Sequence, residues 1–138
     1  MTEVTVRSDR GLSQEIVAAA HRLVSDEPPP AGGDAGPSPR QLLCAALGAC
    51  TAMTIRLYAA RKAWPLEALA VRVRYEAARP GGPGPEARGG DERFDLTIEL
   101  GGALDDAQRA RLLEIAAKCP VHRTLRGQPL VVATLGSA

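Results

Sequence analysis

The chain has 138 residues, 45% of them hydrophobic and 24% charged, so we expect a single domain with a hydrophobic core over residues 1–138. A formal net charge of +1 and an aromatic content of 3% argue against a nucleic-acid partner, and no apolar run is long enough to predict a membrane span. The first residues lack the basic and then apolar pattern of a signal peptide, which favours a cytoplasmic protein. Three cysteines, an odd number, do not suggest a secreted disulfide framework.

Short alternating segments open the chain. Residues 4–6 predict a first strand, and the polar residues 8–11 predict a turn. Residues 14–19 and 21–24 predict two further strands, which together make a meander. We expect His21 to be an ordinary strand residue, because no second ligand lies at metal-binding spacing from it.

A long helix dominates the middle of the sequence. Residues 26–39 are rich in Pro, Gly and Asp, which predicts a surface loop or, alternatively, a loop that shapes the mouth of a pocket. Residues 38–64 then predict a helix that Ser38 caps and Pro39 begins. Two neighbouring faces are apolar, one formed by Leu43, Leu47, Cys50, Thr54 and Leu57 and the other by Leu42, Ala46, Ala49 and Met53. A helix with this pattern is expected to be buried over most of its circumference.

The remaining elements are strands and one further helix. Residues 69–75 and 94–100 alternate and predict paired strands joined by a flexible connection over residues 77–91. Asp105 and Gln108 have the spacing of a capping box that begins a helix running to Cys119. Residues 130–135 predict a final strand. The order β-β-β-α-β-β-α-β favours an α+β fold with a largely antiparallel sheet and helices on one face.

The cysteines differ in their local surroundings. Cys119 precedes Pro120 and a possible helical turn over residues 121–125, so it would be an N-cap whose thiolate the helix dipole stabilises. Core packing is an equally good interpretation of Cys119. Cys50 lies in the middle of a helix and needs a cation from elsewhere in the fold to become reactive. Cys44 is expected on the opposite side of that helix as a packing residue.

A metal site is a weaker alternative. Cys50, Cys119 and His122 would supply three zinc ligands, but no C-x-x-C pair and no fourth ligand accompanies them. The Gly-rich stretches are interrupted by proline and do not form a phosphate loop. We therefore expect neither a metal nor another cofactor.

Two long motifs carry a resemblance to a known family. The stretch SPRQLLCAALGACTAMTIRLYAARKAWPLE, followed about seventy residues later by QRARLLEIAAKCPVHRTL, resembles the OsmC/Ohr family, in the OsmC-like subgroup with GACTAMT and CPVHRTL motifs. The resemblance implies an OsmC-like fold in an intertwined homodimer, with the long central helices buried, the sheets wrapped around them and sites at the interface. It also implies a thiol peroxidase that reduces hydroperoxides, notably organic ones.

The resemblance also implies roles for three residues. Cys50 would be the peroxidatic cysteine that becomes a sulfenic acid, and Cys119 the resolving cysteine that forms a disulfide with it. A small dithiol or a thiol protein would reopen this disulfide. Arg10, in the turn after the first strand, would hold the reactive thiolate of Cys50.

The chain departs from the family pattern at the start of the long helix. Peroxidase members carry an acidic residue there that orients the arginine, whereas this chain has Arg40 and Gln41. Asp26 or Glu27 could substitute if the preceding loop folds back. The departure keeps a second function open, namely a non-enzymatic or differently acting OsmC-like protein that binds a thiol, a persulfide or a small apolar ligand between its cysteines. No role is assigned to His122 beyond orienting Cys119 or capping its turn.

Overall fold

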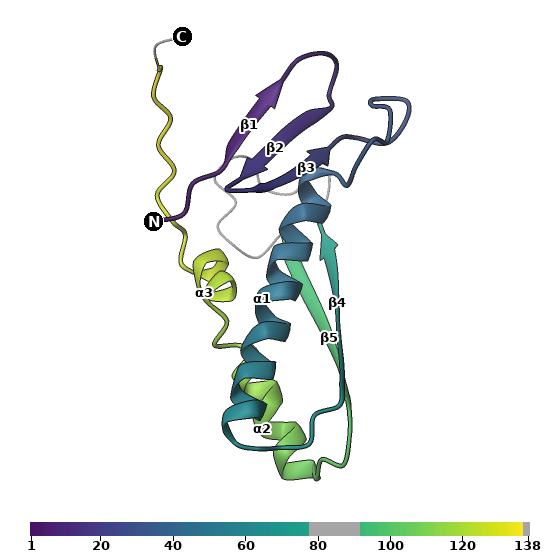
Figure 1. The fold of residues 1–138 in the computed structure, drawn as a ribbon, viewed down its shortest axis with the longest axis vertical. Helices are drawn as coiled ribbons and strands as arrows, with labels where there is room; N and C mark the ends of the chain where they lie inside the picture. The colour runs from purple at the N-terminus through teal and green to yellow at the C-terminus, as the bar shows by residue number, and fades with distance from the viewer. Residues whose placement is uncertain (78–91, 137–138) are drawn as a thin grey trace. The chain divides into compact units, whose positions relative to one another are not determined.

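The computed structural model describes residues 1–77 and 92–136 (Figure 1). Within these residues the elements follow the order β1-β2-β3-α1-β4-β5-α2-α3, and every strand pair is antiparallel. The fold is therefore α+β, as the sequence predicts, with a three-stranded and a two-stranded sheet. The chain forms two compact units, Met1–Ala45 and Ala46–Ala138.

The predicted meander forms the first unit. Strands β1 (Thr5–Ser8), β2 (Gln14–Ala18) and β3 (His21–Ser25) pair in chain order. Ala18 opposes His21, so only two residues connect β2 and β3. The first of them, Ala19, has φ 53°, the left-handed conformation that a tight hairpin turn requires.

The loop after β3 is built around one buried aspartate. The two carboxylate oxygens of Asp26 accept hydrogen bonds from the backbone N–H groups of Glu27 (2.8 Å), Gly33 (3.1 Å) and Ala35 (3.1 Å). The Ser25 hydroxyl donates to the carbonyl of Pro37 (2.9 Å), which returns the loop to the end of β3. The Pro- and Gly-rich segment is therefore an ordered surface loop.

Helix α1 (Pro39–Arg61) begins with a complete capping box. Ser38 Oγ accepts a hydrogen bond from the Gln41 backbone N–H (3.3 Å), and Gln41 Oε1 accepts one from the Ser38 N–H (2.8 Å). The predicted Ser38 cap and Pro39 start are thus confirmed. At the other end, the Trp64 N–H donates to the carbonyl of Ala59 (2.9 Å), which closes the helix before Pro65.

The second unit places a hairpin and a helix against the later turns of α1 (Figure 1). Strands β4 (Ala68–Glu76) and β5 (Arg93–Gly101) pair over their whole length. Helix α2 (Asp106–Ala116) begins with the predicted Asp105–Gln108 capping box. A short helix, α3 (Pro120–Arg126), follows Cys119. The core combines α1, α2 and the segment before α2, through Ile55, Ala59, Leu104, Leu112 and Ala116.

The expected burial of α1 is only partly found. The buried residues form one stripe along the helix, consisting of Leu47, Gly48, Thr51, Ile55 and Ala59. Met53 and Leu57 remain 65% and 72% exposed. The prediction of burial over most of the circumference is therefore wrong for a single chain, because the hairpin and α2 cover one side only.

The predicted strand over residues 130–135 is also wrong for the single chain. Residues 128–136 carry no regular secondary structure, and Leu130, Val131, Val132 and Leu135 are exposed. A strand needs a neighbour to accept its backbone hydrogen bonds, and no described strand pairs with this segment. The predicted connection over residues 77–91 lies, apart from Ala77, outside the described residues.

Helix α1 is long and apolar enough to cross a membrane by length and composition. This finding corrects the expectation that no segment reaches that limit. The core helix of a soluble protein passes the same test, and a single such helix is weak evidence for a membrane span. Arg56, in the apolar part of the helix, donates hydrogen bonds to the backbone carbonyls of Leu66 (2.8 Å) and Glu67 (3.1 Å).

Candidate active site

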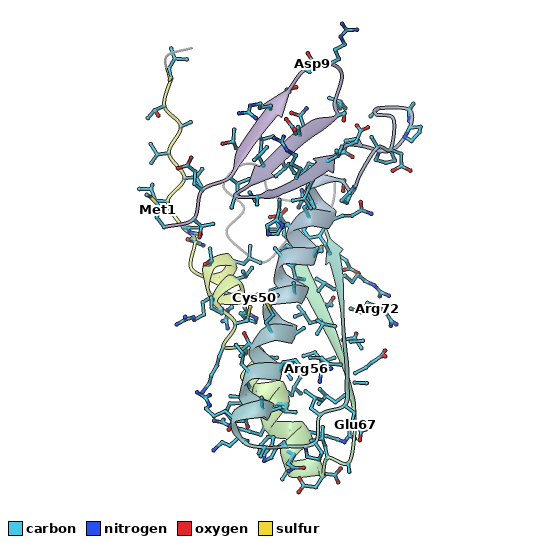
Figure 2. The ribbon with its side chains drawn as sticks, viewed as in Figure 1. Met1, Asp9, Cys50, Arg56, Glu67 and Arg72 are labelled. Carbon is cyan, nitrogen blue, oxygen red and sulfur yellow. The ribbon has the colours of Figure 1, made fainter. Side chains whose placement is uncertain are left out.

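The second unit brings two thiols together from distant parts of the sequence. Cys50 lies near the middle of α1 (Figure 2). Cys119 is the N-cap residue of α3. The two side chains are close enough for each thiol to shift the pKa of the other. Both cysteines are free thiols in this structure, Cys50 partly buried and Cys119 fully buried. Two free thiols that lie close together can be oxidised to a disulfide.

The predicted helical turn after Cys119 is present and acts on its sulfur. Burial by itself raises the pKa of Cys119, but stabilising contacts outweigh it and lower the pKa below the ordinary value. These contacts are the Cys50 thiol, the backbone N–H groups of His122 and Val121, and the Thr51 side chain. Cys119 is therefore an acidic thiol at a helix N-terminus, as its position before Pro120 suggests.

Cys50 has the opposite electrostatic environment. Burial raises the pKa of Cys50, and its hydrogen bond to Cys119 raises it further. The Val121 N–H and the Thr54 side chain counteract this shift only in part. A cation near Cys50 would counteract the effect of burial and lower the pKa of this thiol.

Arg10 is the cation that the family resemblance implies for this role. It lies in the turn between β1 and β2, where its side chain is exposed. None of the described residues pairs with Arg10. Because Arg10 belongs to the first unit and both thiols to the second, its contact with Cys50 stays a prediction.

The missing acidic residue at the start of α1 is not replaced by its nearest neighbours. Gln41 is the capping-box partner of Ser38. Asp26 holds its own loop, and the backbone hydrogen bonds from Ala35 and Glu27 lower the pKa of its carboxyl group. Of the two carboxylates that could substitute for the acidic residue, Asp26 already accepts backbone hydrogen bonds within its own loop. Glu27 is the remaining candidate. Neither the role of Gln41 nor that of Asp26 was found from the sequence.

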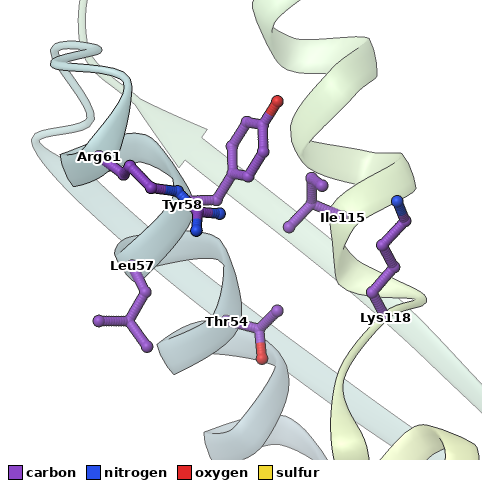
Figure 3. Close-up of a pocket in the computed structure, with 6 residues that line it drawn as sticks. All are labelled: Thr54, Leu57, Tyr58, Arg61, Ile115 and Lys118. Carbon is purple, nitrogen blue, oxygen red and sulfur yellow. The ribbon is translucent and has the colours of Figure 1, made fainter.

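A pocket of about 550 Å³ lies between residues of α1, α2 and the segment after α2 (Figure 3). It is lined by Thr54, Leu57, Tyr58, Arg61, Ile115 and Lys118. Two of the lining residues are close to the cysteines in the sequence. Thr54 lies one turn beyond Cys50, and Lys118 directly precedes Cys119. The Arg111 side chain donates a hydrogen bond to the Tyr58 hydroxyl (3.1 Å) and lowers the pKa of Tyr58. The pocket therefore combines aliphatic walls with cationic groups.

The other candidate ligands do not gather around the thiols. Among residues 1–77 and 92–136, no group of three or more His, Cys, Asp and Glu side chains is placed to hold a metal ion. His122 contributes its backbone N–H to Cys119. Cys44 is partly buried in the first unit and thus separate from the thiol pair.

Thr51 is the residue at this site that the sequence did not indicate. Its side chain is 0% exposed, and it acts on the Cys119 sulfur. A threonine beside a buried cysteine in an apolar helix is the signal that could have drawn attention to it. Its hydroxyl oxygen is buried and has no hydrogen-bond partner among the described residues.

A partly buried thiol beside a fully buried one, on an α+β scaffold, is an arrangement typical of thiol-redox proteins. The chain belongs to the OsmC-like protein family, whose model matches residues 32–134. Among curated proteins, none matches this sequence significantly.

Solved structures share the fold at low sequence identity. An OsmC-like protein from Mycoplasma pneumoniae is similar with a TM-score of 0.78 and 20% identity, covering 92% of this chain and 88% of that one. An organic hydroperoxide resistance protein OsmC from Legionella pneumophila has a TM-score of 0.66 and 21% identity, with coverages of 92% and 90%. A corresponding protein from Elizabethkingia anophelis has a TM-score of 0.68 and 16% identity, with coverages of 92% and 89%. These similarities confirm the OsmC-like fold.

Proposed function

We propose that this protein is a cysteine-based peroxidase that reduces organic hydroperoxides with electrons from a dithiol. The observation that carries the proposal is the proximity of two free thiols, Cys50 and Cys119, inside an OsmC-like fold. Membership of the family supports a redox role related to hydroperoxides. The assignment of the two cysteines to separate steps rests on the matching motifs.

The reaction begins at Cys50. Its thiolate attacks one oxygen of the O–O bond, the bond breaks, and the organic part leaves as an alcohol after taking up a proton. Cys50 is thereby oxidised to a sulfenic acid. The Cys119 thiolate then attacks the Cys50 sulfur and releases hydroxide, which becomes water on protonation. A dithiol reopens the resulting disulfide by exchange and is itself oxidised, so that one hydroperoxide and one dithiol give alcohol, water and a dithiol-derived disulfide.

The pocket lined in part by Thr54 and Lys118 supports the proposal of an organic substrate. Leu57 and Ile115 supply aliphatic walls that would cover the carbon chain of a hydroperoxide but offer little to hydrogen peroxide. Two of the structural neighbours are described as organic hydroperoxide resistance proteins. We therefore expect organic hydroperoxides to oxidise Cys50 faster than hydrogen peroxide does.

A homodimer is part of the proposal. One chain leaves two apolar regions uncovered, namely the side of α1 with Met53 and Leu57 and the segment of residues 130–135. A second copy of the chain would bury both and complete the single OsmC-like domain expected from the sequence. Arg10 would reach a Cys50 thiolate in this assembly. The dithiol or thiol-protein reductant and the cytoplasmic location remain expectations.

A second candidate function has its own supporting observation. Burial and the Cys119 contact raise the pKa of Cys50, and the family's acidic residue is absent at Arg40 and Gln41. If Arg10 does not ionise Cys50, the two thiols and the pocket would bind a thiol, a persulfide or a small apolar ligand without reducing peroxides.

One experiment separates these functions. The reduced protein is treated with one equivalent of an organic hydroperoxide, and intact and digested masses are recorded with time. We expect wild type to form a Cys50–Cys119 disulfide, Cys119→Ser to stop at the Cys50 sulfenic acid, and Cys50→Ser to leave the hydroperoxide unconsumed. Cys44→Ser is the matched control and should behave as wild type. Unchanged thiols in wild type, or full activity of Cys50→Ser, would contradict the peroxidase.

A further inference from the structure

Three cationic side chains lie around the ring of Tyr58 at the end of α1. The Arg61 guanidinium lies 5.6 Å from the ring centre, the Lys62 ammonium 5.7 Å and the Arg111 guanidinium 5.5 Å. Arg111 is paired with Glu114, which accepts a hydrogen bond from it (2.7 Å). Neither Arg61 nor Lys62 forms an ion pair with a described residue. This end of α1 therefore carries positive charge that the described part of the chain does not balance.

The pocket of about 550 Å³ lies beside these cations and adds a further one (Figure 3). Arg61 and Tyr58 line it from α1, and Lys118 lines it from the segment after α2. Lys118 likewise has no ion pair with a described residue. Leu57 and Ile115 add aliphatic walls, and no carboxylate is among the lining residues. The volume falls within the range of about 300–1,000 Å³ that is typical of small-molecule sites.

The two cations that line the pocket have an ordinary structural explanation, which accounts for only part of the arrangement. Arg61 is in the last turn of α1 and Lys118 follows the end of α2, so each complements the negative end of a helix dipole. A helix dipole does not require both cations to line one cavity, nor that cavity to have aliphatic walls. Positive charge next to apolar surface suits a molecule that combines a negative charge with a hydrocarbon chain.

We propose that this pocket binds an aliphatic carboxylate, whose charged group contacts Arg61 and Lys118 and whose hydrocarbon chain packs on Leu57 and Ile115. The guanidinium offers paired N–H donors that match the two oxygens of a carboxylate, and the ammonium adds a further charge-assisted hydrogen bond. Burial of apolar area holds the hydrocarbon chain. The inference goes beyond the proposed function, because it assigns a ligand class to the pocket whether or not the thiols reduce hydroperoxides.

Calorimetric titration of the full chain with three matched probes tests the preference for negative charge. Octanoate, 1-octanol and octylammonium have the same number of carbon atoms and carry a negative, a neutral and a positive head group at neutral pH. We expect octanoate to bind about tenfold more tightly than 1-octanol, which corresponds to one hydrogen bond between charged groups, and octylammonium to bind most weakly. The difference should shrink at high salt, because salt screens these exposed charges. Octanoate that binds no more tightly than 1-octanol would overturn the proposal.

Paired substitutions assign the preference to the two lining cations. Arg61→Gln combined with Lys118→Gln removes both charges and should weaken octanoate binding about tenfold, while 1-octanol, which depends on the aliphatic walls, binds as before. Arg61→Lys combined with Lys118→Arg keeps both charges and should retain the preference for octanoate. All of these side chains are exposed, so the substituted proteins should fold as wild type does. A double Gln variant that still prefers octanoate would contradict the proposed site.

Lys62→Gln is the matched control for these changes. Lys62 lies over the same tyrosine ring as Arg61, but it is not among the residues that line the pocket. Lys62→Gln should therefore bind octanoate within about twofold of wild type, because an exposed charge outside the pocket contributes little. Equal losses in Lys62→Gln and in the double Gln variant would show a diffuse positive field instead of a site. No probe is a hydroperoxide, so a failure of the peroxidase proposal would appear separately, as unchanged thiols in the peroxide experiment.

Discussion

At the scale of single residues, the two thiols of the site have opposite pKa shifts. The stabilising groups of the second unit surround Cys119, whereas burial raises the pKa of Cys50. A peroxidase needs Cys50 as the nucleophilic thiolate, and a nearby cation would lower the pKa of this buried thiol. The OsmC-like motifs imply Arg10 for this task, and its exposed side chain has no partner among the described residues.

Replacement of this cation should therefore slow the first oxidation step. An opposite charge close to a thiolate lowers its pKa by about one to three units, so Arg10→Ala should reduce the thiolate fraction of Cys50, and with it the oxidation rate near neutral pH, at least about tenfold. The rate should recover as the pH rises, because Cys50 then ionises without help. The measurement is the rate of Cys50 sulfenic acid formation against pH in a Cys119→Ser background.

Arg7→Ala is the matched control for this change. Arg7 lies in β1, close to Arg10 in sequence, and its nearest described acidic partner is Glu15, at 3.8 Å. Its removal should leave the oxidation rate and its pH profile as they are. If Arg10→Ala and Arg7→Ala oxidise alike, Arg10 is not the activating cation.

At the scale of elements, the start of α1 is positioned by two polar devices. The capping box of Ser38 and Gln41 determines where the helix begins, and the carboxylate of Asp26 organises the loop that leads to it. In both, a polar side chain accepts hydrogen bonds from backbone N–H groups that would otherwise have no partner within the protein. Gln41 and Asp26 therefore stabilise the local backbone, and neither is bonded to Arg10.

The Asp26 carboxylate should make the order of this loop depend on pH. Backbone hydrogen bonds from Ala35 and Glu27 depress its pKa in the folded protein, so its contribution is fully present above the ordinary aspartate pKa of about 3.9 and is lost as the pH falls through the depressed value. Asp26→Asn replaces a two-oxygen acceptor with a single oxygen and a donor. We expect the amides of Gly33 and Ala35 to exchange about tenfold faster in Asp26→Asn at neutral pH.

Hydrogen exchange resolved by residue is the measurement, and Asp34→Asn is its control. Asp34 lies in the same loop with φ 56°, a conformation that asparagine tolerates, and its exposed side chain holds none of these amides. Asp34→Asn should therefore exchange as wild type does. Unaltered protection of Gly33 and Ala35 in Asp26→Asn would show that the loop is held by other contacts.

At the scale of the whole molecule, the uncovered surface of α1 is the main feature. The helix has an apolar side that the described part of its own chain does not cover, with Met53 and Leu57 at its centre. The segment of residues 130–135 presents further apolar side chains without a neighbouring strand. Exposed apolar area of this kind usually marks an interface, and a second copy of the chain is the partner that the OsmC-like fold implies.

A charge placed on this side of α1 should separate the two copies. Burying an ionised carboxylate without a partner is unfavourable, so Leu57→Glu should raise the dimer dissociation constant at least about a hundredfold. Leu113→Glu, on the exposed face of α2, is the matched control and should leave the dimer intact, because its 62% exposed side chain lies outside the proposed interface. Sedimentation velocity over a range of concentrations measures both. A monomeric wild type, or a Leu57→Glu protein that dimerises normally, would contradict the interface.

Much of this protein follows from its sequence alone, because the relevant signals are local. Alternation predicted β4 and β5, the spacing of Asp105 and Gln108 predicted the start of α2, and Pro120 predicted the helical turn after Cys119. Each depends on residues a few positions apart, whose geometry the backbone dictates. The OsmC-like motifs around Cys50 and Cys119 likewise identified the family.

Only the tertiary structure decided how the thiols are stabilised. The lowered pKa of Cys119 and the raised pKa of Cys50 arise where α1 meets the chain around Cys119, almost seventy residues later. Burial and hydrogen bonding across such a separation depend on packing, which no local pattern records. The same reason explains why the predicted burial of α1 and the predicted strand over residues 130–135 are wrong for a single chain. Each needs a partner surface that the described part of one chain does not supply.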